Sequence, residues 1–221
     1  MHTYKDLVNE VLLRMREDTV TTIGSSRLVA TDDPVVDIVK LAVVDAQNIV
    51  QNAHQWNAER TDWTITTAVG THTYSLTNAG NRATIDTVYA SNGTDLRNVP
   101  LAEIHKKSAA VGTNGTPYIY AANGVDTSGN LRIRFYNTPD SVDTYTVHGF
   151  KKQAPLNLDG DVLLVPDQPV IYLAFALASR ERGETGGAQS SELFVMADQY
   201  LRDAIALDSA NTDLDNTWVV S

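Results

Sequence analysis

The longest regular pattern of apolar and polar positions lies between residues 32 and 57. Apolar side chains recur there at steps of three and four, the spacing of one helical face: Val36, Val39, Val43, Ala46, Val50 and Ala53. Asp32 or Asp33 precedes Pro34, and a carboxylate followed by proline is a typical helix start. The sequence therefore predicts a long helix with one face packed against a core.

Two apolar residues of this helix lie off its main face. Leu41 and Val44 project among polar side chains, namely Asp37, Lys40, Asn48 and Gln51. A second apolar patch indicates a second neighbour, either in the same fold or in another subunit. We predict that Leu41 and Val44 contribute to a subunit interface.

Helical spacing also marks the two ends of the chain. One face runs from Tyr4 to Met15, after a weak capping pattern at Thr3 and Asp6. Residues 170–178, VIYLAFALA, are apolar all round, as expected for a helix at the centre of a helical core. A further helix is predicted from about residue 189 to 207. Each end of the chain therefore contributes a pair of helices.

The middle of the chain has the period of two that is typical of strands. Turn-forming pairs such as Asn92-Gly93 separate the alternating segments. The predicted strands are 61–67, 71–76, 84–91, 118–121, 131–136 and 143–150, with a short helix at 101–110.

These patterns predict an α+β protein. The two helix pairs would bury their apolar faces on each other, giving a four-helix bundle with an inserted antiparallel β region. The expected bundle domain covers 1–60 and 162–208, and the inserted β domain covers 61–153. A linker at 154–161 and an extended C-terminal tail at 209–221 complete the organisation.

The tail combines acidic and apolar residues without any period. Residues 198–221 contain five Asp and one Arg, a net charge of −4, and the segment finishes with an aromatic and aliphatic cluster. We interpret it as a docking peptide, with a frayed terminus as the alternative. The docking residues would be Asp213, Asp215, Trp218, Val219 and Val220.

Composition narrows the possible functions. The 221 residues include 17 Lys and Arg against 27 Asp and Glu, a formal charge of −10. This balance argues against a protein that grips phosphate backbones, but it does not exclude a protein that lets DNA slide past, because a negative wall repels the backbone. The chain has no cysteine, no signal-peptide pattern and no apolar run long enough to span a membrane. We expect a protein that is soluble and intracellular when made.

No motif indicates catalysis or a cofactor. The five histidines lack ligand spacing, and phosphate loops and nucleophile motifs are absent, so no metal and no cofactor are expected. Residues 157–161 resemble the start of a calcium loop, but Gln168 stands where a bidentate Glu is needed. The patch of His105, Lys106 and Lys107 is either a solvated face or a contact with DNA or a neighbour's acidic tail.

The order of elements carries a resemblance. A long helix leads through a Trp-containing turn (QWNAERT, 55–61) directly into a strand, and the helix after the β region finishes with Ala-Ser-Arg-Glu (178–181). With the Thr-Ala-Val-Gly-Thr hairpin at 67–71 and the acidic tail, this order resembles tailed-phage head-to-tail adaptor (connector) proteins. It is similar to the tail tubular protein A group of T7-like phages, although its β region is richer in strands.

The resemblance implies a structural virion protein and not an enzyme. Such a protein would be made in the host cytoplasm and would form a ring, of twelve copies by analogy, in the virion neck. The ring would join the portal protein to a downstream tail nozzle or tail tube protein. DNA would pass through without specific binding, and the tail would dock on the portal.

Two other functions are compatible with the sequence. A β-rich carbohydrate- or receptor-binding module could stack sugars on its tyrosines: Tyr74, Tyr89, Tyr118 and Tyr120. A cell-wall hydrolase could use Glu59, between Trp56 and Trp63, as its acid.

Overall fold

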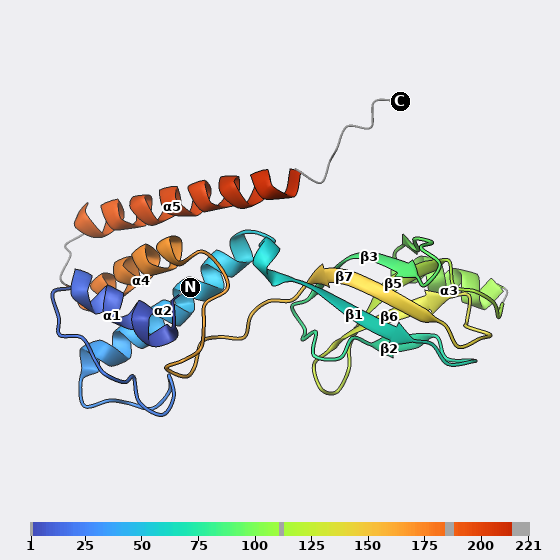
Figure 1. Ribbon diagram of the computed structural model, residues 1–221, viewed down its shortest axis with the longest axis horizontal. Helices are drawn as coiled ribbons and strands as arrows, with labels where there is room; N and C mark the ends of the chain where they lie inside the picture. The colour runs from blue at the N-terminus through green and yellow to red at the C-terminus, as the bar shows by residue number, and fades with distance from the viewer. Residues whose placement is uncertain (1, 111–112, 184–187, 214–221) are drawn as a thin grey trace. The chain divides into compact units, whose positions relative to one another are not determined.

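The computed structural model describes residues 2–110, 113–183 and 188–213. Two helices come first along the chain, seven strands with one helix follow, and two helices come last (Figure 1). The chain divides into two compact units. The helical unit comprises Met1–Ala58 and Gln153–Ser221, and the β unit comprises Glu59–Lys152.

The helical unit begins with two capped helices, α1 (Tyr4–Arg14) and α2 (Pro34–Ala53). Thr3 caps α1 through the backbone N–H of Asp6, and the Asp6 side chain accepts from the Thr3 backbone in return. In α2 the Asp33 carboxylate accepts from the Val35 N–H at 2.8 Å, with Pro34 in the first position. Local sequence therefore sets both helix starts.

Helix α4 (Asp167–Glu181) is the central element of the helical unit. It packs against α1, α2 and α5 (Ala188–Asp213). Its surface is apolar on most sides, so it can bury contacts with several neighbours at once. Together with α1 and α2 it forms one aliphatic core, which also contains Leu156, Leu163 and Val165 from the segment before α4.

The prediction of a four-helix bundle with an inserted β region is wrong, although the α+β class holds. The described residues form five α-helices scattered along the chain and two multi-stranded sheets, and the helix α3 (Leu101–Ala110) belongs to the β unit. Helix α5 packs mainly on α4, and among its described side chains only Ala197 is buried. Its other described side chains are exposed or only partly buried, so α5 forms an outer layer.

The β unit contains two sheets. The first has the order β1 (Arg60–Thr66), β7 (Thr144–Phe150), β3 (Thr84–Ala90), and all its pairs are antiparallel. The second has the order β2 (Thr73–Ser75), β6 (Leu131–Tyr136), β5 (Ile119–Val125), β4 (Arg97–Asn98). It is mixed, because β4 runs parallel to β5.

One core joins the two sheets, and α3 covers the other face of the second sheet. Trp63, Val147 and Tyr145 from the first sheet pack with Ile133, Phe135 and Tyr120 from the second. In β5, Tyr120 faces this core, whereas its neighbours Ile119 and Ala121 pack with Ile104 of α3. Successive side chains of a strand point to opposite faces, so this part of β5 is buried on both sides.

Several element boundaries differ from the sequence-based ones. The long helix ends at Ala53, and the short 3-10 helix η1 (Asn57–Glu59) leads into β1. Helix α5 continues to Asp213, whereas the sequence placed an irregular tail from 209. The two-residue strand β4 was not predicted. None of the described helices has the length and apolarity that a membrane crossing requires.

Candidate interaction surfaces

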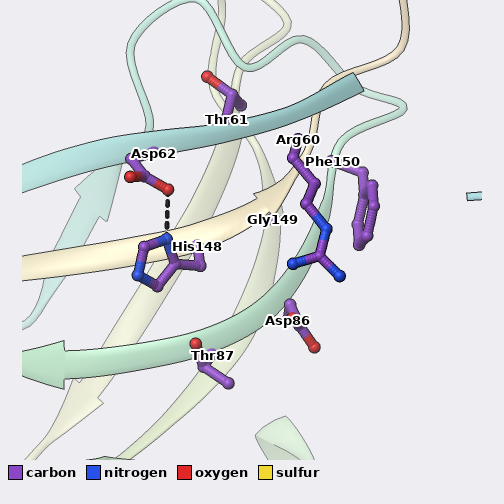
Figure 2. A pocket seen from close by; sticks show the side chains of 8 residues that line it. All are labelled: Arg60, Thr61, Asp62, Asp86, Thr87, His148, Gly149 and Phe150. Carbon is purple, nitrogen blue, oxygen red and sulfur yellow. Dashed lines mark hydrogen bonds and ion pairs between the residues drawn. The ribbon is translucent and has the colours of Figure 1, made fainter. Parts of the chain in front are cut away.

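A polar recess lies on the first sheet of the β unit, where β1, β7 and β3 run side by side (Figure 2). It encloses about 250 Å³. The strand register places Asp62, His148 and Thr87 in one row across the three strands. Side chains in one row of a sheet face the same side. The recess therefore collects polar groups from three strands.

Three side-chain contacts shape this recess. The His148 Nδ1 atom contacts the Asp62 carboxylate, and the Tyr89 ring packs on the imidazole at a centroid distance of 5.0 Å. The Arg60 guanidinium lies over the Phe150 ring, 5.3 Å from its centre, and Figure 2 shows it extending towards β3. These contacts involve four of the side chains that line the recess.

The third strand is irregular at this recess. The pairing of β3 with β7 shifts between Ile85 and Thr87, so Asp86 sits on a bulge. Opposite, Gly149 of β7 approaches β3 so closely that a Cβ atom would lie 2.1 Å from the Thr84 carbonyl oxygen. Only glycine fits this approach. A bulge beside a glycine often marks a place where a sheet is shaped for contact.

The chemistry of the recess favours binding over catalysis. It offers carboxylates, an imidazole, a guanidinium and hydroxyls, but its described side chains do not pair a nucleophile with a base. Within residues 2–110, 113–183 and 188–213, no group of three acidic, histidine or cysteine side chains could hold a metal ion. Mixed charges of this kind suit the polar part of a protein–protein contact.

Trp56 closes the end of α2 in the helical unit. Its ring is buried, and its Nε1–H donates to the Val50 carbonyl at 2.9 Å. Nearby, the Asp208 carboxylate of α5 accepts from the Asn57 N–H and contacts His54 Nε2, both at 3.1 Å. These contacts fasten the second half of α5 to the end of α2.

An apolar groove lies between α2, α4 and α5, and we call it the α5 groove. It encloses about 190 Å³ and is lined by Ile49, Val50, Pro169, Leu173, Phe194, Ala197, Asp198 and Leu201. Ile49 is 47% exposed there. Two cations adjoin it: the Arg180 guanidinium lies over the Phe194 ring at 5.5 Å, and Arg202 pairs with Asp198 at 2.6 Å.

The two predicted interface residues of α2 differ in accessibility. Leu41 is 46% exposed, on a narrow strip that also carries Asp45 and Ile49. Val44 is 7% exposed and belongs to the helical core. Val44 therefore has its second neighbour in its own fold, and the interface role of the two residues stays a prediction.

The predicted basic patch lies on α3. His105 and Lys106 are exposed, and Lys107 is partly exposed. His105 Nε2 lies 3.3 Å from the Arg134 guanidinium, and Lys107 lies 3.9 Å from Glu103. The patch is thus accessible to a partner. It shares its helix with an acidic residue, and its role stays a prediction.

The predicted docking residues fall almost entirely outside the described part of the chain. Asp213 is the last residue of α5, and its side chain is not described. Asp215, Trp218, Val219 and Val220 lie beyond the described residues. Their docking role stays a prediction.

The residues behind the two alternative functions do not form sites. The Glu59 side chain is 0% exposed and pairs with Lys152 at 2.8 Å, so it is not placed to protonate a sugar. Among the tyrosines, Tyr120 is buried, and Tyr74 donates its hydroxyl to the Thr71 carbonyl at 2.7 Å and packs on Phe135. The four tyrosines therefore do not form a continuous platform on which sugars could stack.

Sequence reasoning missed the polar recess and the α5 groove. Asp62 and His148 each occupy the polar phase of an alternating strand, but pairing them requires the register of β1 and β7. Arg180 appeared only as a helix-end cation. The approach of Arg180 to Phe194 depends on how α5 packs on α4, which has no local signal.

Charge is distributed unevenly between the two units. The helical unit has 8 Lys and Arg against 19 Asp and Glu, a formal charge of −11, whereas the β unit has nine against eight, a charge of +1. The acidic character of the chain therefore belongs to the helical unit alone.

Comparison with known protein families relates nearly the whole chain to one of them. A family model described as SU10 adaptor protein matches residues 2–219, nearly the whole chain. A search of curated proteins found no significant match. The family match indicates a structural phage adaptor, located in the virion neck or tail and associated with portal and tail components. The narrower likeness to the tail tubular protein A group is not confirmed.

Proposed function

Because the chain belongs to the SU10 adaptor protein family, we propose that it forms a ring that joins the portal to the tail and extends the DNA channel. Twelve copies are expected by analogy with head-to-tail adaptors. The family match over residues 2–219 is the observation that carries this proposal. The ring is structural, and it performs no reaction.

The charge distribution supports a channel role for the helical unit. DNA carries one negative charge per ~1.7 Å of helix axis. A wall with the charge of the helical unit, −11, repels that backbone and prevents it from sticking. The β unit, near neutrality, suits contact with the next tail protein, and its polar recess offers charged partners for such a contact.

Assembly with the portal tests this proposal. The purified protein is mixed with portal protein at micromolar concentration, and native mass spectrometry measures the complexes. We expect the free protein to be monomeric or weakly associated, and the portal to carry a full ring of copies. A protein that never assembles with the portal of its own phage would refute the proposal.

Leu41 provides a sharper test of how the ring forms. Leu41→Glu places a charge on the exposed strip of α2 and should block ring formation while the monomer stays folded. The matched control is Leu158→Glu, because Leu158 is similarly exposed, at 51% against 46%, but lies in a loop. If both variants form rings equally well, the strip of Leu41 is not the interface.

A further inference from the structure

We propose that the α5 groove of one copy binds the segment 214–221 of a neighbouring copy, with Trp218 as its anchor. The proposal rests on the ring proposed above, since it assigns one of the contacts between adjacent copies. Three properties of the chain support it: the fit of the groove, the charges around it, and the distance that the segment can reach.

The groove has the chemistry of a receptor for an aromatic and aliphatic peptide. Ile49, Leu173 and Phe194 give it apolar walls from three helices, and Ile49 stays half exposed. Trp218 and the following Val219 and Val220 form the most apolar run after residue 207. Buried aromatic anchors in pockets carry much of the energy of protein interfaces.

The charges around the groove complement the segment. Asp213 and Asp215 precede Trp218, and no Lys or Arg follows Arg202 in the sequence. Most of the helical unit repels such a peptide, because its formal charge is −11. The α5 groove is bordered by the exposed Arg180, whereas Arg202 is already paired with Asp198 of the groove lining. Opposite charges at this border select the groove over the rest of the unit.

The segment can reach the groove of its own chain only by running back fully extended along α5. Helix α5 is continuous to Asp213, and its rise of ~1.5 Å per residue puts Leu201 about 18 Å and Ala197 about 24 Å from that end. Trp218 follows Asp213 by five residues, which span at most about 17 Å when fully extended. Even fully extended, the Trp218 backbone would reach no further than the Leu201 end of the groove. The groove of a neighbouring copy has no such restriction, and a head-to-tail contact of this kind closes into a ring when the rotation between copies permits it.

A peptide-binding experiment tests the receptor. A fluorescein-labelled peptide of residues 211–221 is titrated with the full-length Trp218→Ala protein, which lacks the competing anchor, and fluorescence anisotropy is measured. We expect saturable binding, and loss of binding when the peptide itself carries Trp218→Ala. No saturable binding to the folded protein would overturn the proposal.

Groove variants in the same Trp218→Ala background locate the binding site. Leu201→Glu should weaken peptide binding by about tenfold or more, and Arg180→Glu should weaken it by several-fold and reduce its salt dependence. Val195→Glu is the matched control, since Val195 lies on α5 outside the groove lining and is 68% exposed. Circular dichroism checks the fold. Equal binding to Arg180→Glu and Val195→Glu, both at exposed positions, would contradict the assignment.

Cysteine cross-linking decides which chain supplies the segment, because the native protein has no cysteine. Leu201→Cys and Val219→Cys proteins are mixed at high concentration under oxidising conditions, with Val195→Cys replacing Leu201→Cys as the control. We expect a heterodimer from the first pair only. Two results would overturn the proposal. One is a cross-link within a single chain, at high dilution, when that chain carries both Leu201→Cys and Val219→Cys. The other is a Val219→Cys protein that cross-links only to the portal when portal is present.

The outcomes separate this inference from the proposed function. The peptide titration needs neither portal nor ring, so failure of binding leaves the adaptor ring standing. A protein that binds the peptide but never assembles with its portal would instead refute the proposed function.

Discussion

The helical unit and the β unit differ most in how their charges are arranged. The helical unit has a formal charge of −11 and keeps few exposed cations, two of them beside the α5 groove. The β unit is near neutrality, and its charges occur as local pairs such as Glu59 with Lys152. A net field acts over a wide surface, whereas paired charges act at contact distance. The first arrangement suits repulsion of DNA, and the second suits recognition of a protein.

The two units also differ in what limits their packing. The helical core is mostly aliphatic. The buried Lys40 side chain within it donates hydrogen bonds to the loop between α1 and α2. The core of the β unit is rich in aromatic rings, and its tightest feature is the approach of Gly149 to β3. One unit therefore depends on a hydrogen-bonding side chain, and the other on the absence of a side chain.

The largest expected effect is that of Gly149→Ala in the β unit. The new Cβ atom would lie 2.1 Å from the Thr84 carbonyl oxygen and 3.0 Å from the Trp63 ring, and neither the strand backbone nor the buried ring can move freely. We expect the free energy of unfolding of the β unit to fall by about 3 kcal/mol or more. Urea denaturation followed by circular dichroism measures it.

Gly160→Ala is the control for this substitution. A Cβ atom at Gly160 meets no atom within 4 Å, so its effect should stay within about 0.5 kcal/mol. If Gly149→Ala is as mild as Gly160→Ala, the close approach of β7 to β3 is not a determinant of the β unit.

The second effect tests the helical unit through Lys40→Met. The Lys40 side chain is 1% exposed, and its Nζ donates to the carbonyls of Val29 at 2.7 Å and Ile23 at 3.3 Å. Methionine keeps the volume but leaves both acceptors without this donor. We expect a loss of about 2–3 kcal/mol, measured by urea denaturation, and faster proteolysis of the loop from residue 16 to 33.

Lys5→Met is the matched control, because Lys5 is partly exposed and only its backbone N–H makes a bond with the Asp159 carbonyl. Equal stability of the two variants would show that Lys40 does not organise the loop.

The two units also show which structural features the sequence could predict. Both helix starts were predictable, because Thr3, Asp33 and Pro34 act on their own next turn. The helix at 101–110 and the strand at 131–136 were placed with their observed bounds. The four-helix bundle could not be inferred in the same way. The apolar surface of α4 indicates that this helix is buried, but it does not indicate which helices cover it. The polar recess depends on how the strands pair, and the paired residues lie far apart in the sequence. Asp62 and His148, for example, are separated by 86 residues.

A smaller effect is expected at the pair of Glu59 and Lys152, which lies at the ends of the β unit. The Glu59 side chain is fully buried and its carboxylate lies 2.8 Å from Lys152 Nζ. Glu59→Gln keeps the shape and removes the charge, so the Lys152 cation loses its counterion. We expect a loss of about 2 kcal/mol in urea denaturation. The same variant tests the hydrolase alternative, because peptidoglycan turbidity assays should show no activity in either protein.

Lys106→Gln is the control, because Lys106 is an exposed cation of the same unit and should change stability by less than about 0.5 kcal/mol. A Glu59→Gln protein as stable as the control would mean that the buried pair contributes little net stability. Wild-type lysis of peptidoglycan that Glu59→Gln abolishes would revive the enzymatic function.

The smallest effect concerns pH and again distinguishes the units. Burial alone would raise the pKa of Asp37, but hydrogen bonds from Lys40 and Thr31 outweigh burial and hold the pKa below its usual value. A carboxylate with a lowered pKa stabilises the folded state above its unfolded pKa, near 3.9, and that contribution is lost as pH falls through the folded pKa. We expect the free energy of unfolding of the wild type to exceed that of Asp37→Asn by about 1 kcal/mol at neutral pH, with the difference vanishing in acid.

In the β unit, Asp126 also has a lowered pKa, chiefly because it accepts from the Asn130 N–H, but it lies on an exposed turn. Asp126→Asn should therefore give a weaker pH dependence, and urea denaturation at a series of pH values compares the two. A larger effect at Asp126 would mean that the turn, rather than the Lys40 network, is the more pH-sensitive element.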